Sequence, residues 1–232
     1  MTAPKISRRS LLASVPGVSG PTIVIDTFRA FTTAAFLLDR GVDRIVLTET
    51  LEEARERSIS ILDSVLCGEE DGRRPDDFDL GNSPVEAQGY ADATDRVIVM
   101  STSAGTRGVV GALRAGAEPV YAASLVVATA TASALRNRSM VTIIASGLSG
   151  IAIADEDEET ADLIASRLLE HVDDPERLNR IRSGVGAERL RTTPWINPND
   201  LDRCLDIDRF AFAMRARLED GIAILRREGR EL

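Results

Sequence analysis

Lysine, cysteine and histidine are scarce in this chain of 232 residues: of its 28 basic residues only Lys5 is a lysine, and it has two cysteines and one histidine. With so little lysine, a Walker-type lysine loop is absent, as is a GxGxxG motif, which weakens any nucleotide-hydrolysing interpretation. Cys67 and Cys204 provide neither a disulfide framework nor the spacing of a zinc site, so we expect a reducing cytoplasm. His171 lies late in an acidic stretch, which argues against a phosphohistidine mechanism.

Long apolar runs and an excess of basic charge are absent as well. No window approaches the apolar length of a membrane span, so no membrane association is expected. The segment SRRSLLA (7–13) resembles a twin-arginine export signal, but Pro16 and Gly17 break the short apolar stretch after it, and export is not expected. A net charge of −9 argues against nucleic-acid binding. It leaves room for a small anionic substrate, because a local Arg and metal site can invert the potential inside a cleft.

Three polar stretches share one design, in which an apolar strand runs into a polar loop and a helix follows. They are IVIDTFRAFTT (23–33), FDLGNSPVEA (78–87) and VIVMSTSAGTRGVV (97–110). Helix N-termini carry unpaired N–H groups and the positive end of a dipole, so such loops can hold anions. Three of them in one small domain indicate an enzyme that acts on a small phosphate ester.

Each loop also supplies side chains suited to phosphate chemistry. Asp26 and Asp79 can hold a divalent cation, and Arg29 and Arg107 can form paired hydrogen bonds with phosphate oxygens. The remaining candidates, which would donate hydrogen bonds to the substrate, are Thr32, Thr33, Asn82, Ser83, Thr102, Ser103, Gly105 and Thr106. For one loop alone, helix capping and ordinary ion pairs explain these residues better; three loops together reverse that preference.

Strands alternate with helices along the chain, which predicts an α/β fold: a layered fold with a central sheet flanked by helices and the site loops at the carboxyl ends of the strands. Residues 1–22 are expected to form an N-terminal extension, with flexibility possible, and 23–232 a single domain. The expected strands are 23–25, 44–48, 97–100, 119–122 and 141–145. The expected helices are 30–40, 50–66, 84–90, 107–115, 125–136, 160–171 and 208–227, with short helices and loops over 173–200.

Known phosphatase signatures fit poorly. Cys67 and Arg73 have the C-x5-R spacing of cysteine-dependent phosphatases, but acidic residues between them would repel phosphate and raise the pKa of the thiol. A haloacid-dehalogenase motif fails because the second Asp of D-x-D would fall on Phe28. Cys67 is therefore interpreted as a small buried residue.

The order and content of the loops resemble the 2-phosphosulfolactate phosphatase family of coenzyme M biosynthesis. Residues 26–33 read DTFRAFTT where the family has DVLRATTT, 78–84 read FDLGNSP as in the family, and 102–107 read TSAGTR against TTNGTR. Shorter matches are Gly68-Glu69, SLVVA (124–128) and the acidic pair Asp155-Glu156. The chain departs from the family at Ala104 and Val127, where Asn is usual, in the order of the acidic pair, and before Ile23, where the usual first strand and loop are shortened.

The resemblance implies a Mg²⁺-dependent, homodimeric enzyme that hydrolyses the phosphomonoester of a small anionic 2-hydroxy acid, 2-phosphosulfolactate, to 3-sulfolactate and phosphate. It places Asp26, Arg29, Asp79 and Arg107 in catalysis, with water or Asp26 as the attacking group. The candidate metal ligands are Asp26, Glu69, Asp79, Asp155 and Glu156.

Two alternatives remain open. Ala104 and Val127 replace polar residues, which would suit a non-catalytic or repurposed member that binds a different small anionic metabolite. The same scaffold could also serve another enzyme, for example one using a phosphonate or an acyl phosphate. For Arg107, a cation at a helix N-terminus favours a phosphate contact, and the alternative is an ion pair with Glu69 or Asp79.

Overall fold

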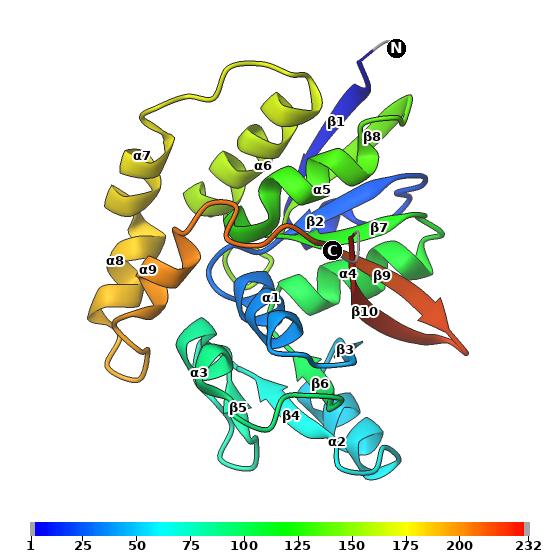
Figure 1. The fold of residues 1–232 in the computed structure, drawn as a ribbon, viewed down its shortest axis with the longest axis vertical. Coiled ribbons are helices and arrows are strands. Elements are labelled where there is room, and N and C mark those ends of the chain that lie inside the picture. Colours follow the sequence, from blue (N-terminus) through cyan, green and yellow to red (C-terminus); the bar gives the residue numbers. More distant parts are fainter. Residues whose placement is uncertain (1–2, 230–232) are drawn as a thin grey trace.

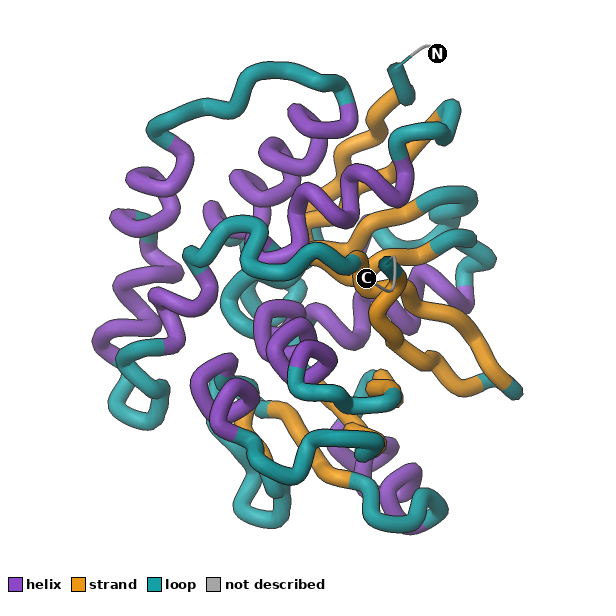
Figure 2. Tube along the Cα trace, viewed as in Figure 1, coloured by secondary structure: helices purple, strands orange, loops and turns teal. Residues whose placement is uncertain are grey.

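The computed structural model describes residues 3–229, and within that range ten strands form one sheet whose two faces are covered by helices (Figures 1 and 2). The predicted α/β fold with a central sheet flanked by helices is confirmed. Across the sheet the strands run in the order β1-β8-β2-β7-β9-β10-β3-β6-β4-β5.

The bounds of the elements follow the alternation that the sequence predicts over most of the chain. The strands are β1 Lys5–Ser10, β2 Thr22–Ile25, β3 Arg44–Thr48, β4 Val65–Gly68, β5 Leu80–Gly81, β6 Val97–Ser101, β7 Val120–Ala123, β8 Met140–Ala145, β9 Ala213–Glu219 and β10 Ile222–Glu228. The helices are α1 Ala30–Asp39, α2 Leu51–Ile59, α3 Pro84–Gly89, α4 Gly105–Arg114, α5 Ala128–Leu135, α6 Asp155–Leu168, α7 Arg177–Ser183, α8 Val185–Thr192 and α9 Asp200–Cys204, with 3-10 turns at Leu12–Ser14 and Leu125–Val127.

The sheet consists of two parallel halves joined by an antiparallel hairpin. Strands β1, β8, β2 and β7 are mutually parallel, and so are β3, β6, β4 and β5. The hairpin β9–β10 lies between β7 and β3 and pairs antiparallel with both. Since the strand direction reverses at three successive pairings, the two halves run in opposite directions along the ladder. Figure 1 shows the hairpin projecting beyond both halves.

The prediction of a final helix over 208–227 is wrong, because this segment forms the β9–β10 hairpin. Asp220 and Gly221 have φ of 49° and 79°, the left-handed values that a two-residue hairpin turn requires. Glu219 pairs with Ile222 across that turn. An Asp-Gly pair between two runs rich in apolar residues is a hairpin signal, and it outweighs the helical propensity of Arg, Leu and Glu here.

The predicted helix over 50–66 is correct only in its first part. It begins as expected, with the Thr50 side chain accepting a hydrogen bond from the Glu53 N–H, but α2 ends at Ile59. Residues 65–68 form β4, which lies between β6 and β5 and buries Val65 and Cys67. Turns follow the end of α2, and pairing with β6 and β5 then makes residues 65–68 a strand.

The interpretation of residues 1–22 as an extension outside the domain is corrected by the structure. Residues 5–10 form β1, which pairs along its length with β8. Beyond it, the N–H of Leu12 donates to the carbonyl of Gly150 at 3.1 Å, and Val15 and Val18 are buried in the core. The N-terminal segment therefore completes one edge of the sheet.

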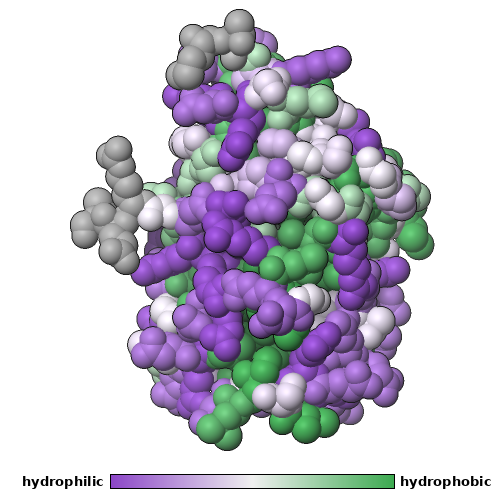
Figure 3. All heavy atoms as spheres, turned by 90° about the vertical axis from the view of Figure 1, so that its right-hand side faces the viewer, coloured by the Kyte–Doolittle hydropathy of each residue, from purple (hydrophilic) through white to green (hydrophobic). Residues whose placement is uncertain are grey.

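The surface on the hairpin side is mostly hydrophilic and is crossed by an apolar strip (Figure 3). None of the helices formed by residues 3–229 combines the length and the hydropathy needed to cross a bilayer.

Candidate active site

A cavity of about 370 Å³ opens where the carboxyl ends of β2, β4, β5, β6 and β8 meet. Residues that follow these strands line it together with α6 and α8. The lining residues are Asp26, Phe28, Arg29, Glu69, Gly72, Asn82, Ser103, Ala104, Gly147, Leu148, Ser149, Ile153, Ala154, Asp155, Glu156, Asp157, Val185, Gly186, Arg189, Leu190 and Ile196.

Asp26 lies directly after β2 and connects the N-termini of two helices. Its Oδ1 accepts from the N–H of Ala30 at 3.2 Å, and its Oδ2 accepts from the N–H of Gly105 at 2.8 Å. A Cβ on residue 105 would lie 2.8 Å from Asp26 Oδ2, so only glycine allows this approach. Asp26 is therefore held rigidly at the floor of the cavity, where the first turns of α1 and α4 converge.

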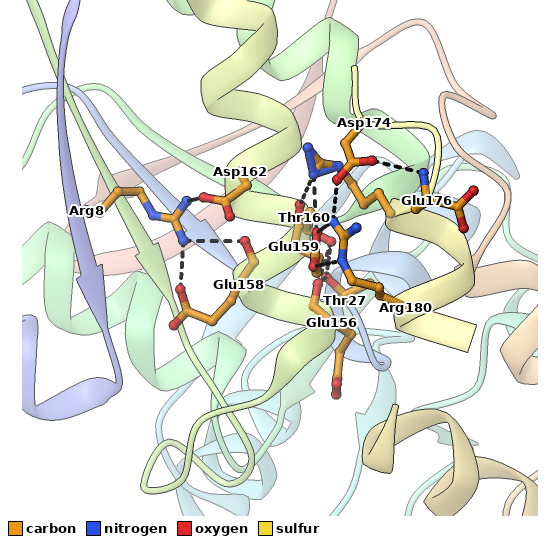
Figure 4. A network of polar contacts seen from close by, with 11 residues as sticks. Arg8, Thr27, Glu156, Glu158, Glu159, Thr160, Asp162, Asp174, Glu176 and Arg180 are labelled. Carbon is orange, nitrogen blue, oxygen red and sulfur yellow. Dashed lines mark hydrogen bonds and ion pairs between the residues drawn. The ribbon is translucent and has the colours of Figure 1, made fainter. Parts of the chain in front are cut away.

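Two further carboxyl groups from the first turn of α6 lie near Asp26. Asp157 accepts from the N–H of Thr27 at 2.7 Å and from the N–H of Gly147 at 2.9 Å, which fixes the loops after β2 and β8 against each other. No other described residue donates a hydrogen bond to the Glu156 carboxylate, although Glu156 is only 8% exposed. In Figure 4 the Glu156 side chain extends away from the ion pairs that Glu158 and Glu159 of α6 form with Arg8 and Arg180.

The three acids have raised pKa values. Burial, followed by the charges of Asp157 and Glu69, raises the pKa of Asp26 to about 8 against the lowering effect of its two backbone donors. Burial and then the charge of Glu156 raise the pKa of Asp157, and burial with the charges of Asp26 and Asp155 raises that of Glu156. At neutral pH the cluster therefore retains protons unless a cation enters.

Glu69 follows β4 and organises the third loop. Its Oε1 accepts from the N–H of Ser103 at 2.7 Å, and its Oε2 accepts from the Ser103 hydroxyl at 3.1 Å and the N–H of Gly72 at 2.6 Å. These contacts leave the Ser103 side chain at the wall of the cavity.

Arg29 is buried and faces the cavity from the loop between β2 and α1. Its Nη1 forms an ion pair with Asp200 Oδ2 at 2.9 Å, and its Nη2 donates to the carbonyl of Gly72 at 3.0 Å. Asp200 is fully buried and also accepts from the Ser83 hydroxyl at 2.6 Å. Since a guanidinium has five N–H donors, Arg29 retains donors for a ligand while Asp200 holds it in place.

Two predicted catalytic residues lie outside the cavity lining, and their placement corrects the sequence interpretation. Asp79 is exposed, and its Oδ2 accepts from the N–H of Leu66 at 2.8 Å, so it anchors β4 instead of facing the site. Arg107 is also exposed, and its Nη1 donates to the carbonyl of Ser103 at 3.3 Å. The helix α4 begins at Gly105, two residues earlier than predicted, which turns residue 107 to the outer face. The alternative ion pair with Glu69 or Asp79 is also not observed.

The predicted hydroxyl donors are mostly occupied by the fold. Thr32 donates to the carbonyl of Thr27 at 3.0 Å, and Thr106 donates to the carbonyl of Thr102 at 3.2 Å. Thr102 and Thr106 also accept each other's N–H groups, at 3.2 and 2.9 Å. Ser83 accepts from the N–H of Glu86, as expected for an N-cap. Thr33 is buried away from the cavity lining, with no partner for its hydroxyl among the described residues. Of the predicted substrate-binding side chains, Asn82 and Ser103 line the cavity.

Of the other residues singled out from the sequence, some line the cavity and others do not. Glu69, Asp155 and Glu156 line the cavity, as does Ala104, whereas Val127 is fully buried outside the lining. Of the two positions where Asn is usual in the family, only Ala104 therefore borders the site. Cys67 is buried in β4, and burial raises the pKa of its thiol to about 12, which fits a structural residue.

Three residues that shape the site were not singled out from the sequence. Asp157 is adjacent to the acidic pair and could have been found from its position in the first turn of α6. Asp200 and Arg189 lie in the irregular segment after α6, where nothing in the sequence distinguishes Arg189 from the chain's many other arginines. Their roles follow only from the fold.

The donor set suits a hard cation such as Mg²⁺. Asp26, Glu156 and Asp155 present carboxylate oxygens, which Mg²⁺ prefers, and burial together with mutual repulsion leaves the cluster in need of positive charge. Within residues 3–229, no three Asp, Glu, His or Cys side chains converge closely enough to hold a metal by themselves. Mg²⁺ commonly binds through one or two carboxylates and fills its remaining positions with water and substrate phosphate, so the site fits that mode of binding.

Comparison with known proteins agrees with the loop motifs. A family model described as 2-phosphosulpholactate phosphatase matches residues 14–213. Three relatives are each called a probable 2-phosphosulfolactate phosphatase. The protein of Pseudothermotoga lettingae is 34% identical over 68% of this chain and 66% of its own, that of Thermus thermophilus 41% over 63% and 60%, and that of Deinococcus radiodurans 38% over 74% and 74%. The chain thus spans less than two thirds of the length of the first two relatives.

Proposed function

The chain belongs to the 2-phosphosulfolactate phosphatase family, and on that premise we propose that it hydrolyses the phosphomonoester of a small anionic 2-hydroxy acid. The names of its relatives support 2-phosphosulfolactate as the substrate, whose hydrolysis would give 3-sulfolactate and phosphate. One observation supports this most directly: a rigidly held buried carboxyl group, Asp26, and a buried guanidinium, Arg29, line the same small cavity.

Binding of the phosphoryl group would rest on fixed donors. Arg29 is oriented by Asp200 and has N–H groups to spare, and Asn82 lines the same cavity. Ser103 lines it as well, but its hydroxyl already donates to Glu69. The carboxamide oxygen of Asn82 is buried without a partner among the described residues; as an acceptor it would contact a bound cation or a ligand hydroxyl, which leaves the amide N–H groups for phosphate. Phosphoryl transfer depends mainly on positioning and on neutralising charge, so preorganised donors of this kind are what the reaction needs.

The acid cluster would handle the proton. The leaving alkoxide at the 2-position needs a proton, and a carboxylic acid whose pKa is raised toward neutrality holds one at physiological pH. Asp26, which contacts the loops before α1 and α4, is the group that we propose as this proton donor. If a water molecule attacks phosphorus, an ionised member of the cluster would accept its proton while Asp26 gives one to the alkoxide. If the Asp26 carboxylate itself attacks, the alkoxide would take its proton from another member of the cluster, since the pKa values of Glu156 and Asp157 are also raised.

Mg²⁺ would be held by Asp26 and Glu156, with Asp155 and Glu69 nearby, and when bound it would neutralise charge on the phosphate. Membership of the family also leads us to propose that the protein is a homodimer in the cytoplasm. Sedimentation of the purified protein tests the oligomeric state.

The test is phosphate release from 2-phosphosulfolactate, 2-phospholactate and 2-phosphoglycolate, each with Mg²⁺ and with EDTA. We expect Mg²⁺-dependent release, fastest from 2-phosphosulfolactate. Absence of metal-dependent release from all three would favour the alternative, a member that binds a small anion without turnover. Thermal stabilisation by ligand without hydrolysis would identify such a binder.

A further inference from the structure

We propose that Arg189 binds the anionic group of the substrate that is not transferred, the carboxylate or the sulfonate, and so sets the preference for substrates with more than one anion. This inference rests on the proposed function, because it assigns a second contact to the same substrate. It assigns a role in substrate specificity to a residue of α8, which lies outside the three polar loops.

The placement of Arg189 is the first argument. Four residues of α8 line the cavity, namely Val185, Gly186, Arg189 and Leu190. Residues 186 and 189 lie one turn apart on the same face, and a Cβ on Gly186 would be 2.4 Å from Glu156 Oε2. The close approach of α8 to α6 at Gly186 therefore brings Arg189 to the cavity wall.

The second argument is that the guanidinium of Arg189 has no direct partner among the described residues. No described residue forms an ion pair with its guanidinium or accepts a hydrogen bond from it, although the residue is half-buried. Its neighbours on the outer surface are paired, Arg191 with Glu188 and Arg182 with Asp202. Glu156 borders the same space, and the charge of Arg189 acts to lower its pKa, but the two side chains do not form an ion pair. A partly desolvated guanidinium with all its donors available is a ready contact for an anion.

The third argument is the relation of Arg189 to Arg29. The Nη2 of Arg29 donates to the Gly72 carbonyl at 3.0 Å, and the Nη2 of Arg189 lies 3.6 Å from the position of a Cβ on Gly72. Both guanidinium groups thus reach the same residue, Gly72, so one small molecule with two anionic groups can contact both. Arg29 belongs to the loop of Asp26, where the phosphoryl group would react. Arg189, next to the apolar Leu190 and Ile196, is left for the other anion.

The experiment compares Arg189→Ala with the wild type and with Arg191→Ala, a control two residues along α8. Phosphate release is measured on 2-phosphosulfolactate and on glycerol 2-phosphate, which has no second anion. Binding of 3-sulfolactate, which has no phosphate, is measured by calorimetry. Arg189→Ala should raise KM for 2-phosphosulfolactate about 10- to 100-fold, as expected for a lost charge-assisted pair, with kcat within a few-fold. It should weaken 3-sulfolactate binding by a similar factor. Turnover of glycerol 2-phosphate should be unchanged, and Arg191→Ala should match the wild type throughout.

An equal loss on both phosphate esters, or wild-type affinity of Arg189→Ala for 3-sulfolactate, would overturn the assignment. If the wild type releases no phosphate from any ester, the proposed function fails, and the calorimetry still decides on Arg189. Arg189→Lys adds a readout that a structural role would not give, since partial recovery of KM indicates charge recognition with loss of the planar fork.

Discussion

Asp26 Oδ2 accepts a hydrogen bond of 2.8 Å from the N–H of Gly105, and this contact joins the two halves of the sheet at their carboxyl ends. Asp26 follows β2 in one parallel half and Gly105 follows β6 in the other, while the β9–β10 hairpin connects the halves along the ladder. The site therefore depends on the junction between the two half-sheets.

Gly105→Ala tests that junction. The added methyl group would lie 2.8 Å from Asp26 Oδ2 and 2.9 Å from Asp26 Cβ, so either Asp26 or α4 must move. We expect a loss of about 1–3 kcal/mol in the free energy of unfolding, typical of overpacking, together with a large fall in activity. Chemical denaturation measures the first quantity. Gly89→Ala is the matched control because a Cβ there meets nothing within 4 Å; equal behaviour of both variants would mean that the contact is unimportant.

Asp200 is expected to hold Arg29 in its catalytic position. It is fully buried and accepts from Arg29 and Ser83, so Asp200→Asn leaves the guanidinium without its counter-charge. Breaking a buried pair in this way costs about 3–5 kcal/mol. Thermal melts should show a clear drop, with activity reduced further in the protein that remains folded. Asp202→Asn, on the exposed side of the same helix, serves as the control and should melt like the wild type.

The buried acid cluster predicts how stability depends on pH. The pKa of Asp26 is raised from 3.8 in its ordinary state to about 8 in the folded protein, and those of Glu156 and Asp157 are raised as well. Between the unfolded and the folded pKa, the folded state binds more protons than the unfolded state. The free energy of unfolding is therefore highest at low pH and falls as the pH rises from about 4 to about 8. Melting temperatures over this range with EDTA should decline, and Mg²⁺ should recover part of the loss near pH 8. A melting temperature that rises through the same window would contradict the assignment of these groups.

Arg107 should be dispensable. Because it is exposed and contacts only the Ser103 carbonyl, Arg107→Ala should change both the melting temperature and kcat/KM by little. Arg29→Ala, the buried counterpart, should abolish turnover. A collapse of catalysis in Arg107→Ala with an unchanged melt would restore the phosphate contact that the sequence alone indicates.

The sequence predicts the frame of this fold better than the details of its site. The strands around residues 23–25 and 44–48, and the Ser83 cap of α3, could be read from local patterns because each depends on neighbouring residues. Those patterns also place Asp26 correctly at the end of a strand and Arg29 in the loop before a helix, whereas the strand before Glu69 was not predicted. The hairpin was missed because helix-forming residues mask its alternation, although its Asp-Gly turn was visible.

What remained hidden depends on contacts between segments distant in the chain. Asp200 meets Arg29 across 171 positions, and Arg189 reaches the cavity only because α8 packs against Glu156. Asp79, in the bend before β5, lies outside the cavity because its carboxylate accepts from the N–H of Leu66 in β4, thirteen positions earlier. The periodicity of neighbouring residues does not predict such long-range contacts, which become visible only in the hydrogen bonds of the folded site.

The most direct measurement is kcat/KM for phosphate release from 2-phosphosulfolactate with Mg²⁺, compared among the wild type, Asp26→Asn and Asp79→Asn. An amide at position 26 cannot carry the proton or the charge, and it cannot accept from both Ala30 and Gly105. We expect activity in the wild type and in Asp79→Asn, and a loss of several orders of magnitude in Asp26→Asn. If raising Mg²⁺ restores turnover, Asp26 acts mainly by holding the metal; if turnover stays absent at every Mg²⁺ concentration, it acts in the chemical step. Wild-type turnover by Asp26→Asn would contradict the account.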